Sequence, residues 1–452
     1  MNATSLRIVL FVACVALSAS AYGQSTTTKP RRPSGTATAT PRPPPPPDRT
    51  GVLVTPPRTP PPDREPVPQP ETPNPATEPV TPPTSRGPAE LAVAEAPSTK
   101  VAASLRRELL LASKDVSEAD AQRAWMQSQG AQLVRRRTLA NLGWVITVYR
   151  LAPDASPAAV IAELVKQWPD AMPESNERYP GLEGPASALP VEYAGRMIHW
   201  PPAGCGRKPR VAMLDGPVNS GLQGFSAGKL TSVVFTPANG KTNYQHGTAI
   251  AAVLVSQGAP QGLLPQAELL LGVVMMDDEG KAYTTTEWIL RGLDWVVGLS
   301  PPPAVLNLSF GGPPSRQLAR AMDRVLAVTR VVAAAGNDGR NRPVFPASHP
   351  GVIGVSAVDA RERRWPGSNT GEHVAIAAPG VDVWTLDGAG NGYYASGTSL
   401  ATAFVTAAIA ISAPTQAQIG EWLPRHARDV GAPRRDDEYG HGVLTLNEGC
   451  VP

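Results

Sequence analysis

The sequence predicts an α/β domain in which a mostly parallel sheet carries helices on both faces. Beyond about residue 200, short runs rich in Val, Leu and Ala alternate with amphipathic stretches, which is typical of parallel strands covered by helices. Thr284-Thr-Thr-Glu287 is a capping signal for a helix that reaches Leu299, and Ser315 precedes a second helix. The expected buried strands are residues 211–214, 269–274, 304–310, 331–335, 352–358 and 374–378.

The composition indicates one ordinary core plus at least one further unit. The chain has 452 residues, of which 42% are hydrophobic, and a formal net charge of +3, which is too small to indicate a nucleic-acid partner. Of its 51 prolines, 23 lie in the first hundred positions. Residues 22–104 are therefore expected to be a disordered Pro/Thr-rich linker, because they contain too few large apolar side chains to offset the entropy of ordering. A docking role for the Pro-x-x-Pro stretches stays open.

Residues 1–21 have the pattern of a secretory signal peptide. Arg7 precedes an apolar run from Ile8 to Ala21, which ends in the small residues Ala19-Ser-Ala21. Such a run is too short to cross a bilayer comfortably, although an uncleaved anchor is the alternative. We expect a secreted or periplasmic protein with no membrane segment in its mature form.

Two cysteines remain once the signal peptide with Cys14 is removed. Cys205 precedes the first strand of the large domain, and Cys450 stands near the end of the chain. In an oxidising compartment this pair predicts a disulfide that ties the two ends of the domain together. Two free buried thiols are the alternative.

A small α+β domain is expected over residues 105–180. Ser117-Glu-Ala-Asp120 predicts the start of one helix, and Ser156-Pro157, a cap followed by proline, predicts the start of another. The predicted strands are residues 108–113, 132–139, 143–151 and 171–179. The order βαββαβ is the split βαβ, or ferredoxin-like, pattern of two-layer domains. The triplet Arg135-Arg-Arg137 is interpreted as a solvated strand face, with a processing site as the alternative.

Three polar residues stand at the ends of apolar segments in the large domain. Asp215 ends an apolar strand, His246 opens an apolar helix in Gln245-His-Gly-Thr248, and Ser399 precedes an apolar helix. A serine at a helix N-terminus is well placed as a nucleophile, although Gly-Thr-Ser also makes a good helix cap. In chain order and in the residues around them, Asp215, His246 and Ser399 resemble the subtilisin-like serine proteases, the subtilases of peptidase family S8.

The resemblance implies a serine endopeptidase with a subtilisin-like fold. It assigns Ser399 as the nucleophile that forms an acyl-enzyme, His246 as general base and then general acid, and Asp215 as the carboxylate that holds the imidazole. Gly216-Pro217 follows the aspartate where the family has Ser or Thr and then Gly. Ala403-Phe404 stand where the family has Pro and His. These departures affect the surrounding turn and helix and leave the three side chains in place.

Two further segments resemble the substrate site of that family. Leu306-Asn-Leu-Ser-Phe-Gly-Gly-Pro313 resembles the strand that pairs with an extended peptide, with a plain core strand as the alternative. Ala333-Ala-Ala-Gly-Asn-Asp-Gly339 resembles the motif in which Asn337 donates a side-chain N–H to the oxyanion, beside the backbone N–H of Ser399. Ser368-Asn369 also follows in the family's order. The implied substrate-binding residues are Ser309, Phe310, Gly311 and Gly336.

The small domain resembles, in position and pattern, the subtilisin propeptide of the inhibitor I9 type, which assists folding and inhibits the enzyme until it is cleaved. Residues 181–200 are then the connector, and residues 201–452 the catalytic domain. The expected partners are a peptide or protein substrate and the chain's own propeptide, and a monomer is expected. No cofactor or metal is required; calcium is common in the family, but Asp277-Asp278-Glu279 is interpreted as a solvated turn.

Two other functions are alternatives to the hydrolysis of peptides. An esterase of the α/β-hydrolase class is disfavoured, because Ser399 stands in Gly-Thr-Ser-Leu-Ala rather than in Gly-x-Ser-x-Gly. A catalytically silent relative that binds peptides or cell-surface partners through the same groove is the remaining alternative. Because every chemical group of the triad is present, a secreted serine endopeptidase is the expected function.

Overall fold

The computed structural model describes residues 107–182, 193–225 and 229–446. The predicted signal peptide, the predicted linker up to residue 104 and Cys450 lie outside the described residues. Half of the predicted connector, residues 183–192, also lies outside them.

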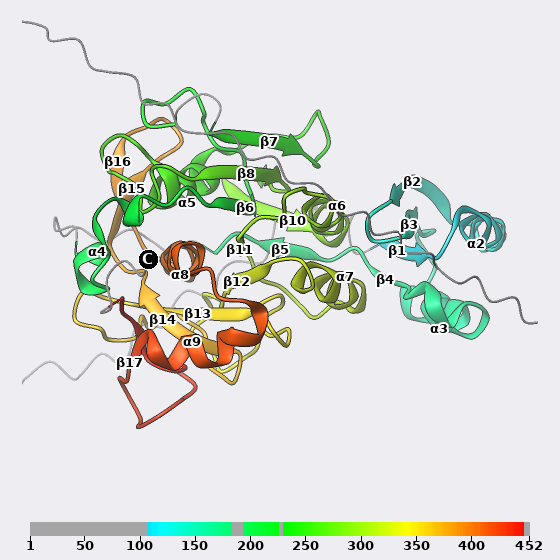
Figure 1. Ribbon diagram of the computed structural model, residues 1–452. Coiled ribbons are helices and arrows are strands. Elements are labelled where there is room, and N and C mark those ends of the chain that lie inside the picture. The colour runs from blue at the N-terminus through cyan, green and yellow to red at the C-terminus, as the bar shows by residue number, and fades with distance from the viewer. Residues whose placement is uncertain (1–106, 183–192, 226–228, 447–452) are drawn as a thin grey trace, which may run out of the picture. The chain divides into compact units, whose positions relative to one another are not determined.

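A nine-stranded sheet forms the large domain (Figure 1), in the order β17-β18-β14-β13-β12-β11-β6-β8-β7. Every neighbouring pair is parallel except β17 and β18 at one edge. All six predicted strands are present, with ends shifted by a few residues. The strands are β6 (Arg210–Asp215), β7 (Leu230–Val234), β8 (Glu268–Val273), β11 (Val305–Leu308), β12 (Arg330–Ala334), β13 (Ile353–Val358), β14 (Val374–Pro379), β17 (Ala427–Arg428) and β18 (Val443–Leu444).

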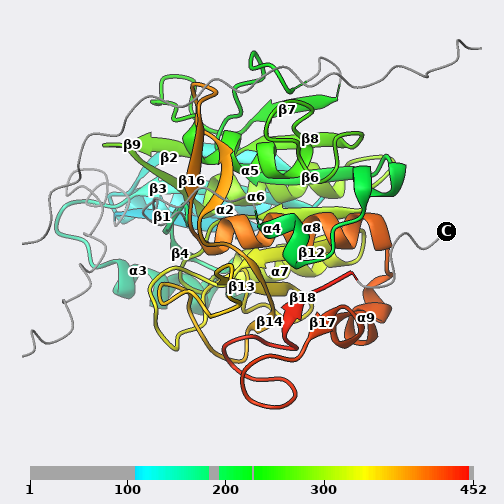
Figure 2. The same cartoon turned by 90° about the vertical axis from the view of Figure 1, so that its left-hand side faces the viewer.

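Helices cover both faces of this sheet, as Figures 1 and 2 show. On one face Val211 and Met213 of β6 share a core with α5 (Gln245–Val255) and α8 (Thr398–Ser412). On the other face Ala212 and Leu214 share a core with α6 (Thr286–Val297) and α7 (Arg316–Leu326). Alternate residues of one strand thus enter two different cores, as the pleat of a parallel sheet requires. The predicted fold class is confirmed.

The helix starts follow the expected capping chemistry. The Thr285 side chain accepts a hydrogen bond from Trp288 N at the start of α6, and Ser315 accepts one from Leu318 N at the start of α7. Within the described residues no single helix is long and apolar enough to cross a membrane. The bent pair of α8 and residues 416–425 meets that test by length and composition alone.

A four-stranded antiparallel sheet forms the small domain, in the order β2-β3-β1-β4. Leu109 and Leu111 of β1 pack against the helices of this domain, as does Tyr149 of β3. The predicted βαββαβ order is present, although the first helix is capped by Asp115, two residues earlier than Ser117. The elements are β1 (Glu108–Ser113), α2 (Val116–Ser128), β2 (Gln132–Leu139), β3 (Trp144–Arg150), α3 (Pro157–Gln167) and β4 (Glu174–Ser175).

The opposite face of the small sheet packs on helices of the large domain. Leu110 and Ala112 of β1 lie in one hydrophobic cluster with residues of α6 and α7. Gln317 of α7, which is fully buried, donates from Nε2 to the carbonyls of Leu110 (3.2 Å) and Met172 (2.8 Å). The small domain therefore uses one face for its own core and the other for its contact with the large domain.

The last predicted strand of the small domain, residues 171–179, is divided between two sheets. Only β4 pairs with β1, whereas β5 (Arg178–Pro180) pairs with β10 (Lys281–Thr285) of the large domain. The prediction of a single returning strand was wrong, because the segment gains backbone partners by leaving its own sheet. β10 also pairs with β9 (Met276–Asp278), so the acidic cluster predicted to be a solvated turn ends a strand. Its Asp278 pairs with Arg178 at 2.7 Å.

Shorter elements complete the fold. Cys205 lies in a 3-10 turn and is disulfide-bonded, while its predicted partner, Cys450, lies outside the described residues. The remaining helices and strands are α4 (Ala194–Met197), α9 (Ile419–Arg425), β15 (Val383–Leu386) and β16 (Gly392–Ala395), and the 3-10 turns are Pro169–Ala171, Pro202–Gly206 and Gln416–Gln418.

Candidate active site

Asp215, His246 and Ser399 form a continuous chain of hydrogen-bonding groups. The Nδ1 atom of His246 lies 2.6 Å from Oδ1 of Asp215, and its Nε2 atom lies 3.2 Å from Oγ of Ser399. All three side chains are buried, with exposed fractions of 0%, 2% and 0%. In this geometry a proton can pass from the hydroxyl to the imidazole while the carboxylate faces the other ring nitrogen.

The fold positions Asp215 and His246 through one close contact between a strand end and a helix start. Asp215 is the last residue of β6, an interior strand of the sheet, and its Oδ1 also accepts from Gly216 N at 2.6 Å. His246 is the second residue of α5. A Cβ on Gly247 would lie 2.3 Å from the carbonyl oxygen of Gly216. Glycine at that position therefore allows α5 to start directly beside the end of β6.

Ser399 is the second residue of α8, which runs through the core. Gly397 is the N-cap of α8, and the helix interior from Thr398 to Ile411 is buried. The backbone N–H groups of the first turn have no partner within the helix itself. They favour negative charge near the Ser399 side chain.

Asn337 lies next to Ser399 and has one uncommitted donor. Its Oδ1 accepts from Thr398 N (3.1 Å) and Thr398 Oγ1 (2.7 Å). Within the described residues its Nδ2 is buried without a hydrogen-bond partner. A buried donor in that state is costly unless another group uses it. The two bonds from Thr398 orient the amide, so that Nδ2 is left for a ligand.

An extended segment of this chain reaches Ser399. Tyr179 and Pro180 of β5 pair with β10, Gly181 bridges Phe310, and the carbonyl oxygen of Leu182 accepts from Ser399 Oγ at 2.5 Å. Gly181 N also donates to Ala282 O at 3.0 Å. The segment is thus held between two strands by backbone hydrogen bonds, as an added β-strand is.

Three of the four predicted substrate-binding residues lie along this segment. The Ser309 carbonyl accepts from Leu182 N at 3.4 Å, and Phe310 forms the bridge to Gly181. A Cβ on Gly311 would lie 3.2 Å from Cδ1 of Leu182, so the leucine side chain occupies the space beside this glycine. A Cβ on Gly336 would instead lie nearest to Asn369 and Val344, so this glycine faces the Asn369 amide rather than the Leu182 side chain.

Sequence reasoning missed Leu182 and Thr398 as members of the site. Nothing in the sequence near Leu182 distinguishes it, since its position depends on the pairing of β5 with β10. Thr398 could have been predicted as a member of the site, because it directly precedes Ser399 and carries a hydroxyl close to the predicted position of Asn337. Within the described ranges no group of three or more His, Cys, Asp or Glu side chains is arranged to hold a metal ion.

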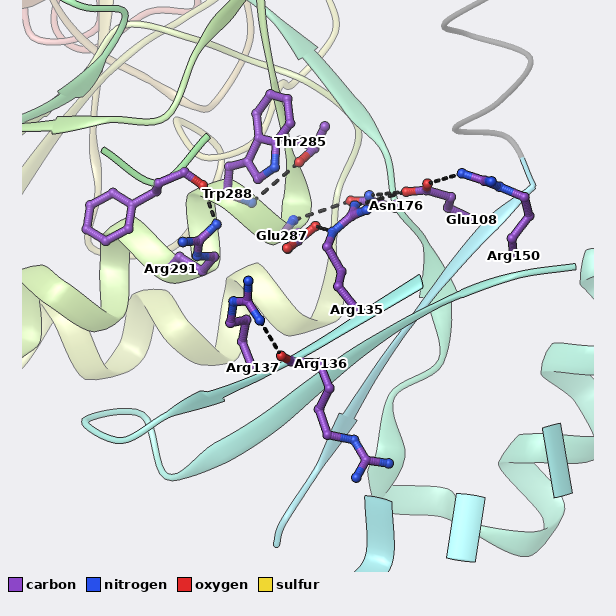
Figure 3. A network of polar contacts seen from close by, with 11 residues as sticks. Glu108, Arg135, Arg136, Arg137, Arg150, Asn176, Thr285, Glu287, Trp288 and Arg291 are labelled. Atoms are coloured by element: carbon purple, nitrogen blue, oxygen red, sulfur yellow. Dashed lines mark hydrogen bonds and ion pairs between the residues drawn. The ribbon is translucent and has the colours of Figure 1, made fainter. Parts of the chain in front are cut away.

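A buried charge network joins the small domain to α6 (Figure 3). Arg135 of β2 pairs with Glu287 of α6 and, at 3.1 Å, with Glu108 of β1. Glu108 also accepts from Arg150 (3.3 Å) and Asn176 (3.0 Å). The interpretation of the arginine triplet as a solvated face was therefore wrong for Arg135, whose partners lie inside the interface.

Two carboxyl groups of the interface have altered acidity. Burial raises the pKa of Glu287, and the charge of Arg135 opposes that shift. Burial also raises the pKa of Glu174 to about 7, although Ser315 and the backbone of Arg316 donate hydrogen bonds to it. Both shifts have the same cause, the removal of a carboxylate from water.

Comparisons with known proteins show the family to which the large domain is similar. The model of the subtilase family matches residues 206–442. The subtilisin of Bacillus pumilus is 30% identical over 256 residues, which cover 53% of this chain and 90% of that protein. The minor extracellular protease Epr of Bacillus subtilis (strain 168) is 28% identical over 258 residues, which cover 54% of this chain and only 39% of that relative.

Solved structures share the fold at low sequence identity. Fervidolysin from Fervidobacterium pennivorans, described as a keratinolytic enzyme related to subtilisin, has a TM-score of 0.59 and 19% identity, and the match covers 76% of this chain and 61% of that one. The epidermin leader peptide processing protease EpiP from Staphylococcus aureus has a TM-score of 0.59 and 17% identity, with 75% and 97% covered. Because the sequence identities are low, these likenesses concern the fold alone.

Proposed function

Because the chain belongs to the subtilase family, we propose that it is a serine endopeptidase that uses Asp215, His246 and Ser399. The observation that carries this proposal is the position of Ser399 Oγ, 3.2 Å from His246 Nε2, with Asp215 2.6 Å from the other ring nitrogen. No further group is needed for the chemistry, because these side chains supply the nucleophile, the proton carrier and the charge that stabilises it. We propose that the reaction requires no cofactor.

The proposed reaction proceeds through an acyl-enzyme. Ser399 Oγ attacks the peptide carbonyl carbon while His246 Nε2 takes the hydroxyl proton, and Asp215 stabilises the imidazolium. The resulting oxyanion accepts hydrogen bonds from Asn337 Nδ2 and Ser399 N. His246 then gives its proton to the leaving amine, and the C–N bond breaks. Water repeats the same steps on the ester, which releases the acid and restores Ser399.

We also propose that the small domain is the propeptide of this enzyme and that the chain is cut after Leu182. The carbonyl of Leu182 lies at the nucleophile, and the preceding residues are bound as an extended peptide would be. A cut there leaves the small domain, which then ends at Leu182, as a bound inhibitor and a mature chain that begins at Glu183. Secretion into the periplasm or the medium, and a monomeric mature enzyme, complete the proposal.

A comparison of the wild-type chain with Ser399→Ala tests the function. We expect the wild-type chain to be processed after Leu182, to label with a fluorophosphonate and to hydrolyse casein. The Ser399→Ala variant should accumulate as a folded, unprocessed precursor that neither labels nor hydrolyses, because it lacks the attacking oxygen. N-terminal sequencing and intact mass give the cut, and circular dichroism confirms that the variant is folded.

The results separate the parts of the proposal. A folded and processed wild-type protein that fails to label would contradict the triad and favour a silent peptide-binding relative. Labelling together with a mature N-terminus elsewhere than Glu183 would leave the protease intact and overturn the cleavage site.

A further inference from the structure

Asn369 lies against the loop that carries Asn337. We call residues 336–342, which follow β12, the oxyanion loop. Residues 367–370 run beside it: Gly339 N donates to Gly367 O (2.8 Å), and Thr370 N donates to Arg340 O (3.0 Å). Asn369 is fully buried in this contact, with 0% of its surface exposed. A buried amide needs hydrogen-bond partners for each of its polar atoms.

Those partners are all backbone groups of the oxyanion loop. Oδ1 of Asn369 accepts from Asp338 N (2.9 Å) and Arg340 N (3.3 Å), and its Nδ2 donates to Arg342 O at 3.4 Å. Its own backbone N–H donates to Gly336 O at 2.9 Å. One residue therefore contacts four alternate positions of the loop, and Asn337 lies between the first two of them.

Gly336 is shaped to receive the Asn369 amide. Its φ angle is +111°, which side chains rarely allow, and a Cβ there would lie 2.3 Å from Nδ2 of Asn369. The missing side chain thus lets the amide approach the backbone immediately before Asn337. The position of Asn337 depends on this contact at its preceding residue and on the Oδ1 contact at its following residue.

The direction of Asn337 Nδ2 depends on two separate restraints. Thr398 fixes the rotation of the amide through Oδ1, as described above. Asn369 fixes the backbone from which the amide projects. An oxyanion donor acts only if it is held in place before the reaction, since reorganisation during the reaction lowers its effect.

We propose that Asn369 is a positioning residue for the oxyanion hole. The inference rests on the proposed role of Asn337. It adds a residue that touches neither the extended segment of residues 179–182 nor the triad. Asn369 acts through Asn337: it holds the loop so that Nδ2 meets the oxyanion in the transition state. Its loss therefore lowers kcat and leaves binding of the ground-state peptide largely unchanged.

A double-mutant cycle with Asn337 tests this proposal. Wild type, Asn369→Ala, Asn337→Ala and the double variant are compared as processed enzymes on one peptide substrate, with concentrations taken from end-point fluorophosphonate titration. We expect Asn369→Ala to lower kcat by about 10- to 100-fold with KM within about twofold. In the Asn337→Ala background the same change should cost less than about threefold, because the donor that Asn369 positions is already gone.

Two further variants control for folding. Ser368→Ala removes the adjacent buried hydroxyl, which accepts from Ala357 N of β13 at 3.1 Å rather than from the oxyanion loop, so its kcat should stay within about twofold of wild type. If Asn369→Ala does not fold, Asn369→Ser enters the same cycle, since its hydroxyl is smaller and retains an acceptor.

The outcomes are distinct from those that test the protease itself. Equal losses of kcat in both backgrounds, or a loss confined to KM, would overturn the positioning role of Asn369. No activity in the processed wild type, or full activity in Asn337→Ala, would instead refute the proposed function on which the inference rests.

Discussion

Single residues at this site divide their polar atoms between structure and reaction. Asn337 gives its oxygen to Thr398 and keeps its nitrogen uncommitted within the described residues. Asp215 uses one oxygen to accept from both Gly216 N and His246 Nδ1. In each side chain the oxygen Oδ1 is held by hydrogen bonds. The remaining group, Nδ2 of Asn337 or the negative charge of Asp215, is therefore presented in a defined direction. A conservative substitution can therefore remove the chemistry while the fold remains.

Asp215→Asn tests that separation. The amide oxygen can still accept from His246, but the negative charge that stabilises the imidazolium is lost. We expect kcat to fall by about 10⁴-fold, the scale known for this change in another serine protease. Steady-state kinetics and the melting temperature of the processed enzyme are measured together. Asp359→Asn is the matched control, because that carboxylate accepts from Arg361 N and Arg363 N in a surface turn.

The N-termini of four helices, α5, α6, α7 and α8, make most of the functional contacts. α5 and α8 begin at the triad, with His246 and Ser399 in their first turns. α6 and α7 begin at the small domain. There Glu174 accepts from Ser315 Oγ (2.5 Å) and Arg316 N (3.2 Å), and Asn176 accepts from Glu287 N (3.3 Å). The short segment around β4 therefore supplies polar caps to two helices of the other domain.

Glu174, the carboxyl group that caps α7, predicts that the stability of the uncut chain depends on pH. The pKa of Glu174 is raised from 4.5 to about 7 by burial in the folded chain. Below pH 4.5 the Glu174 carboxyl is protonated in both the folded and the unfolded chain. As the pH rises towards 7, the unfolded chain releases the proton first. The folded chain therefore loses stability relative to the unfolded chain. Between pH 5 and pH 8 the loss should be on the order of 2 kcal/mol.

Thermal unfolding of the Ser399→Ala precursor measures this loss. The decrease in Tm from pH 5 to pH 8 should be smaller after Glu174→Gln, because glutamine does not titrate. An equal decrease in both chains would show that Glu174 is not the responsible group. A larger decrease in the glutamine variant would contradict the sign of the shift.

At the scale of the whole described chain, the small domain is held by an apolar face, by β5 and by the charges around Arg135. The apolar contact with α6 and α7 is not directional, whereas the pairing of Arg135 with Glu287 and Glu108 requires one arrangement of β2 on α6. Glu287 and Glu108 are 1% and 5% exposed; without Arg135, Glu287 would lose its ion-pair partner, whereas Glu108 would keep Arg150.

Arg135→Ala should destabilise the Ser399→Ala precursor. We expect Tm to fall by about 3 °C or more, since the variant leaves the buried Glu287 carboxylate without its ion-pair partner. Adding Glu287→Gln should restore part of the loss, because a neutral amide is less costly to bury. Arg137→Ala on the same strand is the control and should change Tm little, as Arg137 is exposed. If Arg135→Ala behaves like Arg137→Ala, the pair does not hold the domain.

Local signals explain why much of this molecule could be predicted. β1 and β2 have the predicted bounds, and Ser156, Thr285 and Ser315 cap helices as expected, because alternation and capping depend on residues a few positions apart. The motifs around Asp215, His246 and Ser399 likewise predicted which residues meet. What failed depended on distant partners, as with Arg135, which faces an acidic residue of another domain.

Local sequence patterns were enough to predict the class of fold, the candidate catalytic side chains and the starts of several helices. The division of residues 171–179 between two sheets, the placement of Leu182 at Ser399 and the burial of Asn369 against the oxyanion loop became visible only in the folded chain. The two groups of features differ in the range of the interactions that produce them. Backbone pairing and burial of polar groups select partners that are adjacent only after the sheet has formed, whereas periodicity and caps act within a turn or two of chain.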